Sequence, residues 1–242
     1  MNRFWALTKR NFLEIIRDPL SLVFCVCFPL VMLVLLQIIF LQFEEIPINF
    51  EIKNYSIGMC VFGYSFVSLF VANLIAGDKN TEFMNRLRMA PMSTFKRIFS
   101  YVVAVFPITI AQTIMLLLVS LIFGLPISFN IFLALVYLVP SALFYITLGV
   151  LIGVISKNEK QAGSLSSIIT SSVGILAGIF MPLAVMGTFA DIMNFFPFVH
   201  TVSIATGVFV GDYACIFPNL AWIVGYTALA VLVIWLICRK KY

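Results

Sequence analysis

Long apolar runs separated by short polar segments dominate this sequence. A helix needs about 20 apolar residues to cross a hydrocarbon core about 30 Å thick, and six runs meet that length. The sequence therefore predicts an all-α polytopic membrane protein with six transmembrane helices, forming one membrane domain over 1–242. The predicted spans are 20–41, 55–76, 100–123, 131–155, 161–181 and 219–238. Pro29, Pro107 and Pro140 lie inside three of them and predict kinks, because neighbouring helices can satisfy the freed carbonyls.

Residues 3–17 come before the first span and have an amphipathic pattern. On a helical wheel, apolar side chains share one side: Phe4, Trp5, Phe12, Ile15 and Ile16. Arg3, Arg10 and Arg17 fall on the opposite side. This pattern predicts a helix that lies in the membrane interface and ends before Pro19.

Two polar or broken segments interrupt the series of spans. The segment 77–99 carries five of the fifteen basic residues, and Thr81 predicts the start of a short helix over Glu82–Met89. Such a helix can transmit force from a peripheral motor, or it can be a solvated basic loop that only sets topology. The segment 182–218 contains several Pro and Gly residues, so it predicts short helices and not a clean span.

The distribution of basic residues predicts the orientation in the membrane. Fourteen of the fifteen Lys and Arg residues fall on one side of the six predicted spans, and Lys53 falls on the other. The positive-inside rule then places both termini in the cytoplasm. Charged residues make up 10% of the chain, against about 25% in soluble domains, so a soluble protein is excluded. The net charge of +5 reflects topology, and we expect no nucleic-acid partner.

The sequence lacks the usual catalytic motifs. It has no phosphate-binding G-x-x-x-x-G-K-[ST] loop, no G-x-S-x-G or H-E-x-x-H motif, and a single histidine, His200. We therefore expect no catalytic, cofactor-binding or metal-binding residue in this chain, and we expect energy to come from a partner or an ion gradient. No Asp, Glu, Lys or Arg lies within a predicted span, which disfavours a gradient-driven carrier or channel. Sodium binding by carbonyls and hydroxyls stays possible, as does an intramembrane enzyme that depends on His200.

Small residues recur every three or four positions along the fifth predicted span. They are Ser164, Ser167, Ser171, Gly174 and Gly178. Ordinary close helix packing explains such a stripe, and so does a dimer seam or the polar wall of a substrate pathway.

Three passages, in this order, resemble the permease subunits of type-2 bacterial ABC exporters: KRNFLEIIRDPLSL, DKNTEFMNRLRMAPMSTFKRI and GIFMPLAVMGTFADIMNFFPFVHTVSIATGVFVGD. The resemblance implies a homodimer or heterodimer of permeases in the bacterial plasma membrane, surrounded by lipid. It also implies two cytoplasmic ABC ATPase subunits, which bind ATP and magnesium. The substrate would be a hydrophobic or amphipathic molecule moved out of the cell: a drug, a peptide antibiotic, a lipid or a lipid-linked glycan.

The resemblance also implies roles for particular segments. The helix 3–17 would be the connecting helix, and short re-entrant helices over 182–211 would form the outer gate. A coupling helix would contact the ATPase through Thr81, Glu82, Asn85, Arg86, Arg88 and Met89. Asp78 and Glu82 only approximate the pair of acidic residues found in many members at the start of this loop.

Overall fold

The computed structural model describes residues 3–79 and 81–240, and none of these residues lies in a β-strand. Within that range the side chains of Leu20, Ser21, Arg88, Ala184 and Lys240 are not described. The predicted all-helical class of membrane protein is confirmed.

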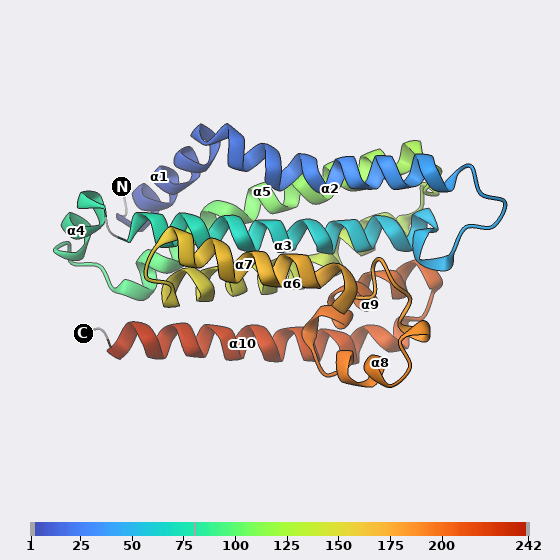
Figure 1. Ribbon diagram of the computed structural model, residues 1–242. Coiled ribbons are helices and arrows are strands. Elements are labelled where there is room, and N and C mark those ends of the chain that lie inside the picture. The colour runs from blue at the N-terminus through green and yellow to red at the C-terminus, as the bar shows by residue number, and fades with distance from the viewer. Residues whose placement is uncertain (1–2, 80, 241–242) are drawn as a thin grey trace.

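Six long helices lie side by side, and each runs opposite in direction to the long helix before it (Figure 1). They are α2 (Pro19–Phe40), α3 (Ile52–Asp78), α5 (Thr94–Ile122), α6 (Phe129–Ile155), α7 (Glu159–Leu176) and α10 (Ile216–Lys240). The three prolines predicted to lie inside spans do lie within α2, α5 and α6.

Five of these helices are long and apolar enough to cross a membrane, and α7 is the exception. Its serines and its polar first turn lower its hydropathy. It also ends at Leu176, before the predicted limit of 181, because Gly178 turns the chain with a φ of 73°. The N–H groups of Ile179 and Phe180 both donate to the carbonyl of Gly174, which closes this turn.

Helix α3 forms the centre of the bundle. About 78% of its most apolar stretch is buried inside the chain, against 17% for α10, which lies at the periphery. Helix α6 approaches α3 closely because Gly149 and Gly153 have no side chains. A Cβ at Gly149 would lie 2.3 Å from the carbonyl oxygen of Ser68, so only glycine fits this crossing.

The two ends of the bundle differ in structure (Figure 1). At one end lie α1 (Arg3–Arg17), the short helix α4 (Glu82–Arg88) and the end of α10. At the other end lie short helices that fill the broken segment 182–218 and the loop after α2. They are η1 (Ile48–Phe50), η2 (Leu183–Val185), α8 (Thr188–Met193), α9 (Pro197–Val210) and η3 (Tyr213–Cys215).

Helix α1 packs only partly through the face that the sequence pattern indicates, with Ile15 buried and Phe12 packed against the core. Its buried residues are Leu7, Thr8, Asn11 and Ile15. Trp5 and Ile16, placed on the apolar side by the helical wheel, are 58% and 50% exposed. Arg10 turns toward the bundle because the carboxylate of Asp78 lies there. The wheel describes one helix alone and therefore misses this partner.

Candidate functional site

The short helix predicted over Glu82–Met89 exists as α4, and its first turn is capped by Thr81. The Thr81 hydroxyl accepts the N–H of Met84 at 3.2 Å and donates to the carbonyl of Asp78 at 2.8 Å. An N-cap of this kind satisfies a backbone donor that the helix itself leaves unpaired. The last residue of α3 and the first turn of α4 are thereby joined, with Asn80 outside the described residues.

The remaining predicted coupling residues differ in what they contact. Glu82, Asn85, Arg86 and Met89 are exposed, and Met89 is 81% accessible. Arg86 and Glu82 lie 3.4 Å apart as a solvent-exposed ion pair, which contributes little to stability. The side chain of Arg88 lies outside the described residues. The exposed face of α4 therefore makes few contacts with the rest of the chain and contributes little to its stability.

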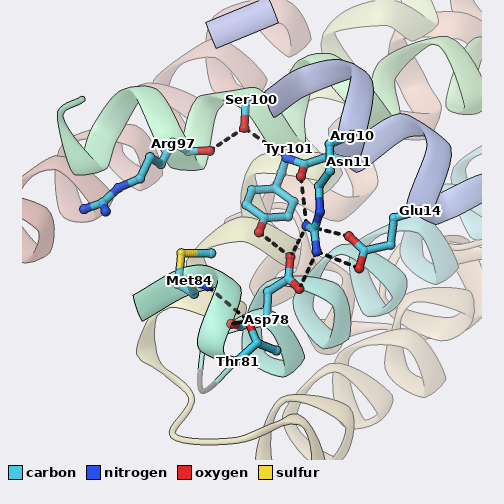
Figure 2. A network of polar contacts seen from close by, with 9 residues as sticks. All are labelled: Arg10, Asn11, Glu14, Asp78, Thr81, Met84, Arg97, Ser100 and Tyr101. Carbon is cyan, nitrogen blue, oxygen red and sulfur yellow. Dashed lines mark hydrogen bonds and ion pairs between the residues drawn. The ribbon is translucent and has the colours of Figure 1, made fainter. Parts of the chain in front are cut away.

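Next to α4 lies a group of charged and polar side chains, the Asp78 cluster: Arg10, Glu14, Asp78 and Tyr101 (Figure 2). Asp78 and Tyr101 are buried, and Arg10 and Glu14 are partly exposed. Asp78 is 6% exposed. Its two carboxylate oxygens accept from the two terminal nitrogens of Arg10 at 2.7 and 3.2 Å, a bidentate arrangement. The Tyr101 hydroxyl donates to the same carboxylate at 2.5 Å. Asp78 therefore points into the protein, toward α1 and α5.

Arg10 connects three helices through this cluster. Besides Asp78 of α3, it pairs with Glu14 of its own helix at 2.6 Å, and its guanidinium lies 4.4 Å from the centre of the Phe83 ring in α4. Burial lowers the pKa of Arg10, but the hydrogen bond and attraction to Asp78 outweigh it and hold the pKa above its ordinary value. Burial and the nearby Asp78 charge raise the pKa of Glu14, more than Arg10 lowers it.

Two further sets of contacts lie around the start of the loop that carries α4. The ammonium of Lys79 donates to the carbonyls of Gly153, Val154 and Ser156 at 3.1, 2.6 and 2.6 Å, where α6 ends. A cation at this position complements the negative end of the helix. Asn11 of α1 donates to the Ser100 hydroxyl of α5 at 3.0 Å. The start of the loop is therefore tied to α1, α5 and α6.

The predicted stripe of small residues divides into two parts. Ser164, Ser167 and Ser171 lie on the exposed face of α7, and the hydroxyls of the first and last donate to carbonyls of their own helix. Gly174 is buried against the Phe180 ring, and Gly178 lies beyond the end of the helix. The serines are therefore available to a neighbouring molecule, whereas the glycines serve the turn that ends α7.

Sequence reasoning missed the surroundings of His200, at the opposite end. Its side chain is 9% exposed, stacks on Trp222 at 5.3 Å between ring centres, and contacts Asn219 and the carbonyl of Asn194 at 2.6 and 2.9 Å. These contacts join α9 to α10. These contacts explain why His200 is buried: its side chain links α9 to α10.

The structure is thus a bundle of apolar helices that carries a short exposed helix beside the Asp78 cluster. The chain matches the ABC-2 type transporter family over residues 2–210 and therefore belongs to that family. It is a multi-pass membrane component of this transporter class.

Among curated proteins, the chain is similar to ABC transporter G family member 23 of Dictyostelium discoideum. The two are 29% identical over 140 residues, which is 57% of this chain and 20% of that protein. The chain thus aligns with one fifth of the relative's length. No solved structure gives a significant match.

Proposed function

We propose that this chain is the membrane-spanning subunit of an ATP-driven exporter, and that α4 is its attachment to a cytoplasmic ABC ATPase. The observation that carries the proposal is the contrast between the two sides of α4. Glu82, Asn85, Arg86 and Met89 are exposed. By contrast, Phe83 of the same helix contacts Arg10 of α1, and the adjoining Asp78 and Lys79 are bound to α1, α5 and α6. A binding surface that is rigidly joined to several apolar helices is what mechanical coupling requires.

In this proposal the end of the bundle that carries α4 faces the cytoplasm. Both ends of the described chain lie there, together with the basic segments that the positive-inside rule assigns to the cytoplasm (Figure 1). Helix α7 serves as the sixth span because it packs along α3 through the bundle, despite its serines. The helices α8 and α9 at the far end are the re-entrant elements of an outer gate.

Two copies of the chain would meet through the exposed serine face of α7. Exposed hydroxyls are better placed against a second copy or a polar pathway than against lipid tails, and small side chains allow close approach. A cysteine at Ser167 should cross-link two copies in native membranes, using a background without the five natural cysteines. A cysteine at Leu229, exposed on α10, is the control and should not cross-link.

The chain itself would hold no ATP, magnesium or other cofactor and would catalyse no reaction. These functions belong to the ATPase, which closes on ATP and moves the two α4 helices together. The transported molecule would be hydrophobic or amphipathic, and the setting would be a bacterial plasma membrane. The family membership and the apolar bundle support the part of the proposal that makes this chain a membrane component of a transporter.

The test is co-purification of the tagged chain from its native membrane in mild detergent. We expect a protein with a Walker A loop in about equal amount. The Arg86→Glu variant should weaken the association, because Arg86 is exposed on α4 and its side chain has few contacts of its own. Lys160→Glu, an exposed lysine at the same end of the bundle, is the matched control and should leave the association intact.

Purification of the chain without any ATPase would refute the proposal and favour a gradient-driven carrier or channel. Equal loss in the Arg86→Glu and Lys160→Glu variants would show that net charge, and not α4, governs the association.

A further inference from the structure

Helix α9 lies at the end of the bundle opposite α4 (Figure 1), and both ring nitrogens of its His200 face oxygen atoms. Nδ1 lies 2.6 Å from the side-chain oxygen of Asn219 in α10, and Nε2 lies 2.9 Å from the backbone carbonyl oxygen of Asn194. Amide oxygens of both kinds accept hydrogen bonds and donate none. Both contacts are therefore hydrogen bonds only when each ring nitrogen carries a hydrogen.

The orientation of the Asn219 amide is fixed by a second contact. Its nitrogen donates to the backbone carbonyl of Cys215 at 2.7 Å. A rotation of the amide by half a turn would offer this nitrogen to His200, but it would place the amide oxygen against the Cys215 carbonyl, where two acceptors repel. The Asn219 oxygen therefore faces the ring. A neutral imidazole has a single N–H, so it can make only one of the two hydrogen bonds, whereas the imidazolium makes both.

The surroundings of the ring also suit a positive charge. The ring lies nearly parallel to the indole of Trp222, with 3° between the two planes and 5.3 Å between the ring centres. The face of a tryptophan ring attracts a cation at this distance. His200 is 9% exposed, and its partner Asn194 is exposed, so water lies close to the Nε2 edge of the ring and can exchange protons with it.

Other titratable or charged side chains occur on the elements around α9, but the ring has different hydrogen-bond partners. They are Lys53 and Tyr55 of α3, Tyr137 and Tyr145 of α6, Asp191 of α8, Asp212 after α9, Tyr213 and Cys215 of η3, and Tyr226 of α10. Lys53, Asp191 and Asp212 are exposed, where water and salt screen their charges. The charge on the ring is therefore governed mainly by the two oxygens and the indole that contact it.

We propose that His200 is a proton-dependent link, in which the imidazolium ties α9 to α10 and the loss of its proton breaks one of the two hydrogen bonds. Histidine is the side chain whose charge ordinarily changes between pH 5 and 8, so the link is complete in acid and weakened at higher pH. Since α9 belongs to the outer gate in the function proposed above, acid outside the cell would hold that gate closed. This last consequence rests on the proposed function, whereas the link itself is tested on the chain alone.

The first measurement is the fluorescence of Trp222 in the purified full chain, in detergent micelles, between about pH 5 and pH 8. Trp5→Phe and Trp235→Phe, made together, leave Trp222 as the only tryptophan in the chain. A stacked imidazolium quenches indole fluorescence because it accepts an electron from the excited ring, and a neutral imidazole does not. We expect the fluorescence to rise as pH increases, and we expect His200→Gln to abolish the rise.

Asn219→Asp distinguishes proton binding from simple packing. A carboxylate against Nδ1 favours the imidazolium, so the midpoint of the fluorescence change should move up by about one pH unit or more. Ala221→Asp is the matched control, because it places a carboxylate on an exposed part of α10, about 200° around the helix from Asn219. It should move the midpoint much less. This pair of variants provides the answer if His200→Gln fails to fold.

The second measurement is hydrogen exchange of the α9 amides at about pH 5 and about pH 8, corrected for the dependence of the intrinsic exchange rate on pH. In the chain with native His200 we expect about tenfold greater protection in acid, the effect of one hydrogen bond from a charged group. His200→Gln should show equal protection at the two pH values.

Three results would overturn the proposal. One is Trp222 fluorescence that is constant with pH, or that changes equally in His200→Gln. Another is the same shift of the midpoint in Asn219→Asp and Ala221→Asp. A third is equal protection of α9 at both pH values, which would show that the ring does not hold this helix through its proton. None of these results decides whether an ATPase co-purifies with the chain, so this proposal and the exporter proposal can fail separately.

Discussion

Replacing Asp78 by Asn should destabilise the protein through the Asp78 cluster. The substitution keeps the size of the side chain but removes the charge that receives Arg10 and Tyr101. A hydrogen bond to a charged group contributes about 1.5–3 kcal/mol. The amide still accepts one hydrogen bond, and Arg10 keeps Glu14 as a partner. We therefore expect a loss of about 2 kcal/mol in the free energy of unfolding, a factor of about 30 in the ratio of folded to unfolded protein.

The assay is equilibrium unfolding of the purified chain in mixed micelles. Asp191→Asn, an exposed aspartate on α8 at the far end, is the control and should change stability by less than about 0.5 kcal/mol. Arg10→Gln alone should cost about 3 kcal/mol, because it leaves a buried carboxylate without its cation.

The double variant of Arg10→Gln and Asp78→Asn decides whether the pair acts as a unit. If the two residues interact, the double variant should lose at least about 1 kcal/mol less free energy of unfolding than the sum of the losses in the two single variants. Costs that add within about 0.5 kcal/mol would refute the reasoning, since they would show that Arg10 and Asp78 stabilise the fold independently.

Three other substitutions test separate parts of the structure. Gly149→Leu should destabilise the α3–α6 crossing by about 1–3 kcal/mol in the same unfolding assay, whereas Gly225→Leu, where a Cβ meets nothing within 4 Å, should not. The Glu14→Gln variant should be more stable than wild type at neutral pH, because the raised pKa of Glu14 means that the folded state disfavours the charged carboxylate. The difference in stability should shrink as pH falls through that pKa. A difference that stays constant with pH would contradict the reasoning. Lys79→Met should speed hydrogen exchange at the end of α6, and unchanged exchange would show that the three carbonyl contacts do not hold that end.

The sequence predicted the helices well where apolar runs decide them. Helices α2, α3, α5, α6 and α10 each match a predicted span to within a residue or extend beyond it, because each run is long and apolar enough to specify a helix without help from neighbours. Thr81 was identified as the start of α4 from local chemistry alone, and its capping contact is present. Helix α7 was harder, because its serines and the turn at Gly178 compete with the apolar pattern.

The candidate site was only partly predictable, for a physical reason. Asp78 and Arg10 are 68 positions apart, and a helical wheel or a loop motif contains no information about such a pair. Arg10 therefore seemed to belong to the solvent side of its helix, and Asp78 to the surface of the loop. The packing of α1 against α5 brings them together, and that packing depends on the whole bundle.

The division of α4 into a fixed base and an exposed face has a consequence for how such proteins diversify. Glu82, Asn85 and Arg86 make few contacts within the chain, so their identities are nearly free of selection for folding. If α4 docks an ATPase as proposed, a duplicated copy of this chain could acquire a new docking specificity through a few surface changes, with the Asp78 cluster left unchanged. Under that proposal, engineers could exchange the recognition surface without rebuilding the residues that hold α4 in place.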